Sequence, residues 1–460
     1  MDALMLGVSG MRGTIGGTLT PPVVSQLASA FAVWLQQTEK PANGTHFRVV
    51  IGRDSRPSGP WVRDAAAAAL AASGVEVIDL DVVTTPGVEM MIKHTGADAG
   101  LIATASHNPI NWNGIKYLNR DGIALPPESA AQLKKLFEEK TTTYARVEHL
   151  HPAVRNTETH ALHVKRVLER VDVLGVSTKR YKVVLDSVNG AGCVATATLI
   201  NKLGCQLVHL NNKPDGQFPH EPEPIEKNLT ELAGEVKRQK AHVGFAQDPD
   251  ADRLAIVDEN GRYIGEEYSL VLCARHVLSK KPGGIAVTNL STSRMLDDVA
   301  AKFGGSVVRT PVGEANVIQA ILKHNAPIGG EGNGGVIDPR IVCGRDSLVG
   351  IAYILQLMAD TGKTISQLVA EFPRYEIVKE KFECRREDAN RAVEAVKQAF
   401  ANEKIDVQDG IRIDWPDAWV HARPSNTEPI MRIIAEAPDR ETADKRIAAV
   451  RTVVNTALGR

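Results

Sequence analysis

The chain has 460 residues, of which 43% are hydrophobic and 24% are charged, and its formal net charge is −1. This length exceeds one ordinary hydrophobic core, so we expect several folded domains. A near-zero net charge supplies no field that attracts nucleic acid or an anionic membrane. The five cysteines lack the close pairs of a zinc site, and the N-terminus lacks the pattern of a secretion signal. We therefore expect a cytoplasmic protein with no nucleic-acid or membrane partner.

The first part of the chain alternates between strand-like and helix-like segments. The strand-like segments are residues 47–52, 75–83 and 99–104, and the helix-like segments are 61–73 and 87–95. The second part repeats this order, with strands at 181–185, 205–210 and 242–246 and helices at 192–203 and 229–240. The first series leads into Ser106 and the second leads into Asp248.

A third series has strands at 284–289 and 306–310 and helices at 293–303 and 314–324, and it ends in an expected loop at 326–337. From about Tyr375 the pattern is mixed, with helices at 388–402 and 440–458 and strands at 418–422 and 430–437. These patterns predict three similar α/β domains with mixed sheets and a smaller C-terminal α+β domain. The expected domains are residues 1–152, 153–256, 257–372 and 373–460. Ligand sites of α/β sheets lie at the carboxyl ends of strands, so we expect the polar loops to converge on one cleft.

The first candidate site is the turn that contains Ser106. The segment 104–109 follows an apolar strand and ends in Asn-Pro, which favours a tight turn that presents the serine. Read alone, an ordinary turn is the better interpretation. A serine hydrolase is disfavoured because Ala105 and His107 stand where a nucleophile elbow has glycines. His107 is also a poor default base, because neighbouring side chains usually diverge.

The second candidate site has carboxylates at alternate positions, Asp248, Asp250 and Asp252. In an extended segment this alternation would send all three to one side, where they need a cation. Hard oxygen ligands favour Mg²⁺. A calcium EF-hand is excluded because Arg253 occupies the position that needs glycine and because the flanking segments are strands.

The third candidate site is the glycine-rich segment 329–335, which carries Glu331 and Asn333. Glycines let the backbone approach a ligand closely, and these two side chains can bind adjacent hydroxyls of a pyranose ring. Glu331 could equally be a solvated loop charge.

The fourth candidate site is the segment 423–429, which lies between two expected strands. It combines groups suited to a dianionic phosphate, namely Arg423, Ser425, Asn426 and Thr427. It lacks the glycines and lysine of a P-loop, and a plain hairpin turn is the alternative.

These four segments, in this order and preceded by the segment 9–13, resemble the α-D-phosphohexomutase superfamily, which includes phosphoglucosamine mutase and phosphomannomutase/phosphoglucomutase. The resemblance covers nearly the whole chain and implies four domains around a central cleft. It implies that Ser106 carries a phosphoryl group and, with Asp248, Asp250 and Asp252, binds one Mg²⁺ per chain.

The resemblance also assigns the remaining site residues. Those at the reaction centre are Arg12, His107, Lys116 and Arg253, with Lys116 as the candidate general base. The substrate-binding residues would be Gly313, Glu314, Glu331, Asn333, Arg423, Ser425, Asn426 and Thr427. Two departures concern the sugar: Asn333 stands where many bacterial members have serine, and Glu314 where the family often has histidine or aspartate.

The implied reaction moves phosphate between the 1- and 6-positions of a hexose through phosphorylated Ser106 and a bound hexose 1,6-bisphosphate. Asn333 favours glucosamine phosphate, with mannose or glucose phosphate as the alternative. Two different functions also stay open, a phosphosugar phosphatase that uses the same serine and a non-catalytic phosphosugar sensor. We expect a small phosphosugar as the partner and a monomer or homodimer.

Overall fold

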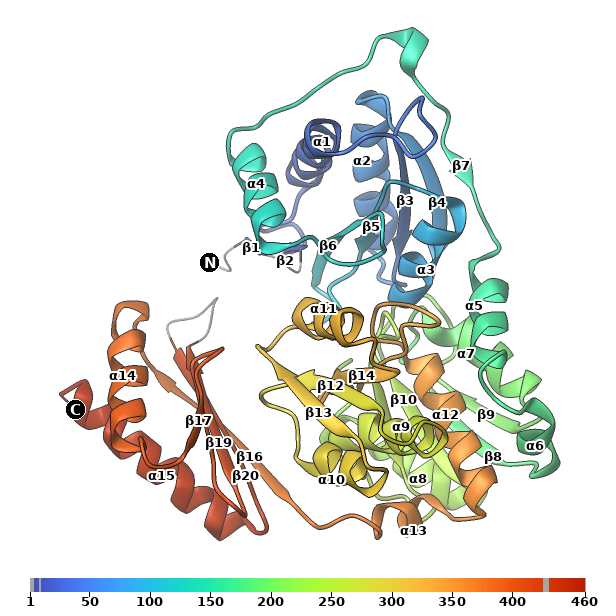
Figure 1. Cartoon of the computed structure of the whole chain (residues 1–460). Coiled ribbons are helices and arrows are strands. Elements are labelled where there is room, and N and C mark those ends of the chain that lie inside the picture. Colours follow the sequence, from blue (N-terminus) through green and yellow to red (C-terminus); the bar gives the residue numbers. More distant parts are fainter. Residues whose placement is uncertain (1–3, 8–9, 425–429, 460) are drawn as a thin grey trace. The chain divides into compact units, whose positions relative to one another are not determined.

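The computed structural model describes residues 4–7, 10–424 and 430–459 (Figure 1). The chain forms two compact units. Unit 1 comprises Met1–His276 and Asn333–Gln367, and unit 2 comprises Val277–Gly332 and Leu368–Arg460. Sheets covered by helices occur in both units, which confirms the α/β class expected from the sequence. Within the described ranges, no helix is both long and apolar enough to cross a bilayer.

The first sheet of unit 1 has seven strands in the order β1-β2-β6-β5-β3-β4-β7. Its parallel strands are β3 (Arg48–Arg53), β4 (Glu76–Val82), β5 (Ala99–Ala103) and β7 (Val154–Arg155). Its antiparallel strands are β1 (Met5–Gly7), β2 (Gly10–Thr14) and β6 (Trp112–Asn119). The register pairs Arg53 with Ala103, so the segments that follow β3 and β5 leave the sheet at the same edge.

Four helices accompany this sheet, α1 (Pro21–Thr38), α2 (Gly59–Ala72), α3 (Thr85–Thr95) and α4 (Pro127–Glu138). Figure 1 shows α1 and α2 side by side over the sheet. Ala66 and Leu70 of α2 are buried in one core with Val49 and Leu101 of the strands. This burial explains the alanine-rich stretch of α2, because small side chains allow a helix to pack closely against a neighbour.

The second sheet of unit 1 has the order β11-β10-β8-β9. The strands are β8 (Lys182–Asp186), β9 (Gln206–Leu210), β10 (Val243–Gln247) and β11 (Leu254–Val257), and only β10 with β11 is antiparallel among them. The accompanying helices are α5 (Thr159–Leu168), α6 (Val173–Thr178), α7 (Gly192–Lys202), α8 (Thr230–Gln239) and α12 (Ser347–Thr361). All five residues of β10 are buried, as expected for a central strand covered on both faces.

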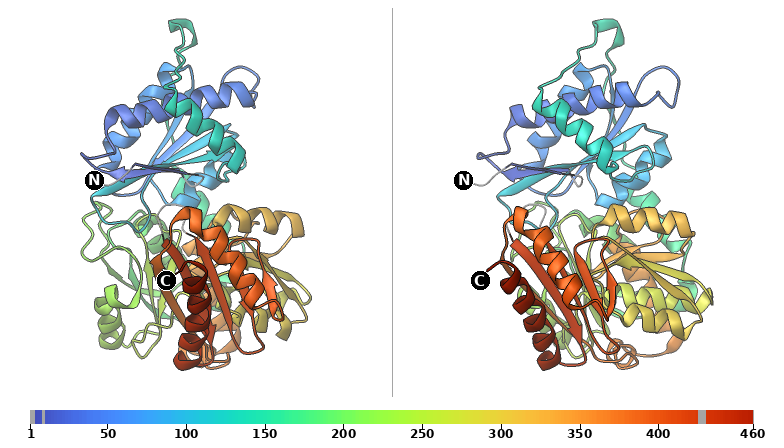
Figure 2. Two further views of the ribbon diagram at one scale, coloured as in Figure 1. Left: turned by 90° about the vertical axis from the view of Figure 1, so that its left-hand side faces the viewer. Right: turned by 60° about the vertical axis from the view of Figure 1, so that its left-hand side comes forward.

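Unit 2 contains the parallel strands β12 (Ile285–Asn289), β13 (Ser306–Thr310) and β14 (Ile328–Glu331), with α10 (Met295–Lys302) and α11 (Glu314–His324). Its other sheet is antiparallel and has the order β16-β20-β19-β18-β17. These strands are β16 (Glu376–Glu383), β17 (Lys404–Asp406), β18 (Ile411–Asp414), β19 (Trp419–Pro424) and β20 (Ile430–Ala437). Figure 2 shows α14 (Arg386–Ala399) and α15 (Arg440–Ala457) on one face of this sheet. The remaining elements are α9 (Glu267–Lys280), α13 (Ile365–Val369) and β15 (Gly335–Ile337), with 3-10 turns at Val147–His149 and Glu226–Asn228.

The expected loop at 326–337 is wrong, because it contains the buried strands β14 and β15. The glycines that suggested a loop instead permit close packing. A Cβ on Gly329 would lie 2.8 Å from the carbonyl oxygen of Val287 and 2.5 Å from the Ile321 side chain. The other predicted elements agree with the structure within a few residues at each end. The domain boundaries and the central cleft stay predictions.

Candidate active site

Ser106 lies in the loop that follows β5. It adopts φ +50, a left-handed conformation that costs a non-glycine residue about 1 kcal/mol, and it is buried. Its N–H donates to Thr104 Oγ1 at 2.9 Å, and the Thr104 hydroxyl donates to Asp54 Oδ2 at 2.7 Å. The loop therefore holds the serine in a conformation that local sequence preferences would not choose.

The Ser106 hydroxyl donates to Asp248 Oδ2 at 3.0 Å, across 142 residues of sequence. Nδ1 of His107 also lies 3.2 Å from Ser106 Oγ, so the two neighbouring side chains do not diverge as expected. Burial and the nearby Arg253 charge lower the pKa of His107 to about 3. With Ser106 unphosphorylated, His107 is therefore a neutral hydrogen-bonding group at neutral pH.

The three aspartates lie in the turn between β10 and β11. Ala251 has φ +56, and its N–H donates to the Asp248 carbonyl oxygen at 2.9 Å. Asp248 Oδ1 accepts the N–H groups of Asp252 and Arg253, each at 3.1 Å. The expectation of an extended segment with alternating side chains is wrong: a tight turn brings the carboxylates together.

One carboxylate oxygen from each of Asp248, Asp250 and Asp252 lies within 4.8 Å of the others, and all three residues are fully buried. Burial, together with the charges of Asp252 and Asp250, raises the pKa of Asp248 well above its usual range. Asp250 Oδ1 and Asp252 Oδ1 are buried and have no hydrogen-bond partner among the described residues. Three carboxylates that converge, and two carboxylate oxygens that lack a hydrogen-bond partner among the described residues, fit a hard divalent cation.

Two cationic side chains of unit 1 contact the acidic turn. Lys116, on β6, places Nζ 2.8 Å from Asp250 Oδ2 and 3.5 Å from Asp252 Oδ2. Arg345 donates from Nη2 to Asp252 Oδ2 at 2.6 Å. Burial alone would raise the pKa of Asp252, but Arg345, Lys116 and Arg253 outweigh it and lower that pKa. The turn thus already has partial charge compensation.

Arg12 lies on β2, two strands from β5, and its pKa is lowered, chiefly by burial. Asp250 and Asp252 oppose that lowering, so Arg12 lies in the field of the acidic turn. Its Nη1 reaches Asn108 Oδ1 at 3.5 Å, in the same loop as Ser106. Unit 1 therefore brings together Ser106, His107, Lys116, Arg12, Arg253 and the three aspartates.

The predicted sugar-binding residues are divided between the units, with Asn333 in unit 1 and Glu331 in unit 2. Glu331 is the last residue of β14 and is buried, and Asn289 Nδ2 donates to its Oε1 at 2.9 Å. It is therefore not a solvated loop charge. Its orientation is fixed by the neighbouring strand.

The other predicted substrate residues of unit 2 lie at ends of elements. Gly313 caps the N-terminus of α11 with φ +130, and Glu314 is the first residue of that helix. Arg423 lies near the end of β19, with Nε 3.1 Å from Asp409 Oδ2. Ser425, Asn426 and Thr427 lie outside the described residues.

Three residues at this site were not predicted from the sequence. Arg345 contacts Asp252 from a loop 93 positions away, and no local pattern marks it. Asp54 and Arg56 form a buried ion pair behind the Ser106 loop, with Arg56 Nε 3.0 Å from Asp54 Oδ2. The sequence does contain an indication of this pair, because both polar residues come shortly after the predicted strand 47–52, just as Ser106 comes shortly after the predicted strand 99–104.

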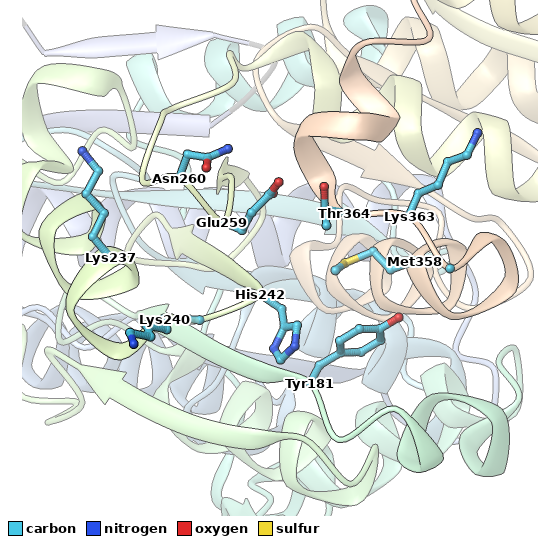
Figure 3. Close-up of a pocket in the computed structure, with 11 residues that line it drawn as sticks. Tyr181, Lys237, Lys240, His242, Glu259, Asn260, Met358, Lys363 and Thr364 are labelled. Atoms are coloured by element: carbon cyan, nitrogen blue, oxygen red, sulfur yellow. The ribbon is translucent and has the colours of Figure 1, made fainter.

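A pocket of about 650 Å³ lies elsewhere in unit 1 and contains none of the predicted site residues (Figure 3). Its lining includes Lys237, Lys240, His242 and Lys363. The amino groups of Lys237 and Lys363 point away from each other in Figure 3. These cations do not converge as they would around a phosphate, so the acidic turn remains the candidate active site.

Family models of phosphoglucomutase/phosphomannomutase match the chain in four segments. The α/β/α domains I, II and III match residues 3–144, 161–261 and 266–375, and the C-terminal domain matches residues 380–453.

Similar proteins agree with this match. A phosphoglucomutase/phosphomannomutase of Thermococcus kodakarensis is 39% identical over 95% of this chain and 96% of the relative. A probable phosphoglucosamine mutase of Methanopyrus kandleri is 36% identical over 95% and 94%. The crystal structure of a phosphoglucomutase/phosphomannomutase family protein from Burkholderia thailandensis matches with a TM-score of 0.85 and 27% identity, over 98% of each chain.

Proposed function

The chain belongs to the phosphoglucomutase/phosphomannomutase family of phosphohexomutases, and from that membership we propose that Ser106 carries the phosphoryl group that this isomerase transfers. The observation that carries the proposal is the 3.0 Å contact between Ser106 Oγ and Asp248 of the acidic turn. A nucleophile that touches a cation site is suited to phosphoryl transfer, in which charge on the phosphoryl oxygens must be stabilised.

Asp248, Asp250, Asp252 and the Ser106 phosphate would hold one Mg²⁺, whose chemistry is to offset charge on the transferring phosphoryl group. The chain's own cations, Arg12 and Arg253, act on the same oxygens. Phosphorylated Ser106 donates its phosphoryl group to a hexose monophosphate. The resulting hexose 1,6-bisphosphate reorients while bound, and its other phosphate returns to Ser106.

We propose that Lys116, as the neutral amine after release from its ion pair with Asp250, is the general base that takes the proton of the attacking sugar hydroxyl and later returns it. Its side chain is 14% exposed and its Nζ lies 2.8 Å from Asp250, so it is oriented toward the reaction centre. Lys116→Met should lower kcat by about 100-fold or more, as loss of a general base does. The exposed Lys93→Met is the matched control and should keep normal turnover. Near-normal turnover of the Lys116 variant would overturn this role.

We propose glucosamine phosphate as the preferred substrate, with mannose or glucose phosphate as the alternative. Asn333 and the similarity to a probable phosphoglucosamine mutase support the first, and the Thermococcus relative supports the second. Glu331 and Asn333 would bind sugar hydroxyls, Gly313 and Glu314 would discriminate among sugars, and the segment Arg423–Thr427 would bind the phosphate that does not react. Side-by-side kcat/KM values for the three hexose phosphates decide the preference, and a much higher value for mannose phosphate would overturn our choice.

The second candidate activity is a phosphatase that uses the same serine. Ser106→Ala would inactivate either enzyme, so the decisive measurement is product. A mutase is stimulated by hexose 1,6-bisphosphate and interconverts hexose phosphates without net release of inorganic phosphate. Stoichiometric phosphate release would show a phosphatase. We further infer a cytoplasmic monomer or homodimer, which light scattering after size-exclusion chromatography would test.

A further inference from the structure

The guanidinium group of Arg56 lies against the backbone of the Ser106 loop. Nη2 donates to the carbonyl oxygens of Ser106 and Asn108 at 2.7 and 2.6 Å. Nη1 donates to the carbonyl oxygens of Pro109 and Trp112 at 2.7 and 3.1 Å. Four carbonyl groups of a seven-residue segment, which begins at Ser106 and ends at the first residue of β6, thus converge on one side chain.

The same guanidinium is fully enclosed. Its remaining N–H, on Nε, donates to Asp54 Oδ2 at 3.0 Å, so all five donors of the side chain are used. Arg56 is 0% exposed, and the ring of Phe218 lies 5.0 Å from its central carbon. Asp54 also accepts the Thr104 hydroxyl, which in turn accepts the Ser106 N–H. Arg56 and Asp54 therefore hold the loop at both its carbonyl and its amide groups.

Contacts within unit 1 connect this arrangement to the acidic turn. Gly216, two positions before Phe218, donates its N–H to the Asn189 carbonyl oxygen at 3.1 Å. Ala191, two positions after Asn189, donates its N–H to the Pro249 carbonyl oxygen at 2.8 Å, inside the turn of the three aspartates. The segment that covers Arg56 and the turn that holds the carboxylates are thus fixed to the same short stretch of chain, 189–191.

We propose that Arg56 is the positioning residue that sets the Ser106 loop at the distance from the acidic turn that phosphoryl transfer requires. The proposal rests on the phosphate-carrying role of Ser106 given above. Arg56 acts through the loop backbone rather than on the substrate. Small displacements of reacting groups cost about 100-fold in rate, so loss of this contact should lower kcat with little change in KM.

Lysine cannot replace Arg56 in this role. An ammonium group has three donors that radiate from one nitrogen, whereas the planar fork presents five donors in fixed directions. Lysine keeps the positive charge opposite Asp54 and leaves several loop carbonyls without donors. Arg56→Lys thus separates the geometry of the side chain from its charge.

The test uses the full-length enzyme with its best hexose phosphate, Mg²⁺ and hexose 1,6-bisphosphate. Three variants are compared: Arg56→Ala, Arg56→Lys and the control Arg63→Ala on α2. Both Arg56 variants should lose about 100-fold in kcat with KM within about threefold of the unaltered enzyme, and the control should stay within about twofold. Free guanidinium at about 20 mM should raise the kcat of Arg56→Ala at least about tenfold, because the cavity keeps its four carbonyls and Asp54. Urea and sodium chloride at equal concentration should restore none.

A normal kcat in Arg56→Lys would overturn the proposal, as would a folded Arg56→Ala enzyme that guanidinium does not reactivate. If Arg56→Ala does not fold, the Arg56→Lys comparison decides alone. Ser106→Ala in the unaltered background separates the two proposals. An active Ser106→Ala enzyme would refute the phosphate-carrying role, whereas an inactive one leaves the Arg56 outcomes to be judged by themselves.

Discussion

Replacement of Asp248 by asparagine should stabilise the metal-free protein while it abolishes the activity. The asparagine side chain retains an oxygen that can accept the N–H groups of Asp252 and Arg253, and its amide can donate to Ser106 Oγ. The substitution therefore replaces a carboxyl group whose ionised form is disfavoured in the folded protein, and it keeps the hydrogen bonds of the turn. What it changes is the repulsion among the three carboxylates.

The size of this effect follows from the geometry. One oxygen of each carboxylate lies within 4.8 Å of the others, so at an effective dielectric constant of about 20 each pair of ionised carboxylates repels by at least about 3.5 kcal/mol. The neutral amide removes two such pairs and also the desolvation cost that raises the pKa of Asp248, but it loses the attraction to Arg253. We expect about 2 kcal/mol of net stabilisation, or roughly 2–3 °C in melting temperature for a chain of this length.

The assay is thermal unfolding in EDTA and in excess Mg²⁺. Mg²⁺ at about 100 times its dissociation constant should stabilise the unaltered protein by about 2.7 kcal/mol, and Asp248→Asn should lose most of this gain. Asp258→Asn is the matched control. Asp258 is equally buried, but it accepts hydrogen bonds from Asn260 N–H and from Arg262 N–H and Nε. The Asp258→Asn protein should have a lower melting temperature than the unaltered protein, both in EDTA and in Mg²⁺. An Asp248→Asn protein that melts below the unaltered protein in EDTA, or that keeps the full Mg²⁺ shift, would refute this electrostatic account.

Three further predictions concern other parts of the chain. Burial lowers the pKa of His421 to about 4, so below about pH 6.5 the unfolded chain binds a proton that the folded chain excludes. The free energy of unfolding, measured with urea, should therefore fall by up to about 3 kcal/mol between pH 6.5 and 4. His421→Gln should flatten this dependence on pH, and an unchanged dependence would contradict the assignment. Burial raises the pKa of Cys193 and Cys205 to about 12, and all five thiols are free and buried. Ellman's reagent should therefore label the native protein slowly and should label all five cysteines in urea. Rapid labelling of the native protein would contradict the burial of the thiols. A Cβ on Gly216, at φ +69, would lie 2.3 Å from the Ser55 carbonyl oxygen. Gly216→Ala should therefore lower the free energy of unfolding by about 1–3 kcal/mol and also lower kcat. Unchanged stability and kcat would contradict the prediction.

Sequence patterns predicted the fold class and about half of the described helices and strands, because alternating apolar segments of strand and helix length leave few choices of architecture. They failed at 326–337, where glycines serve a close approach to Val287 and Ile321 rather than a loop. A glycine in a sequence can indicate either a flexible loop or a site where another element packs closely. The neighbouring strand and helix, which the sequence does not show, decide between the two.

The candidate site shows the same limit. The spacing of the three aspartates marks them as a candidate cation site, whereas Ser106 is singled out only by the resemblance of the four segments to a known family, because its own segment reads better as an ordinary turn. The manner of their convergence could not be predicted, because it depends on the left-handed Ser106 and Ala251. Arg345 and Arg56 act through contacts with residues distant in sequence, Asp252 and the 106–112 loop, and arginines of this kind resemble any others until the chain is folded.

The hold of Arg56 on the Ser106 loop has a consequence for how the catalytic cycle divides its motion. A backbone fixed at four carbonyls and at one left-handed residue gives the serine little freedom to carry its phosphate from place to place. If Ser106 carries the phosphoryl group, as we propose, the phosphate carrier is the stationary partner of the reaction. To present first one phosphate position and then the other to Ser106, the sugar itself has to reorient while it stays bound. A rigid Ser106 loop therefore requires free space around the bound sugar.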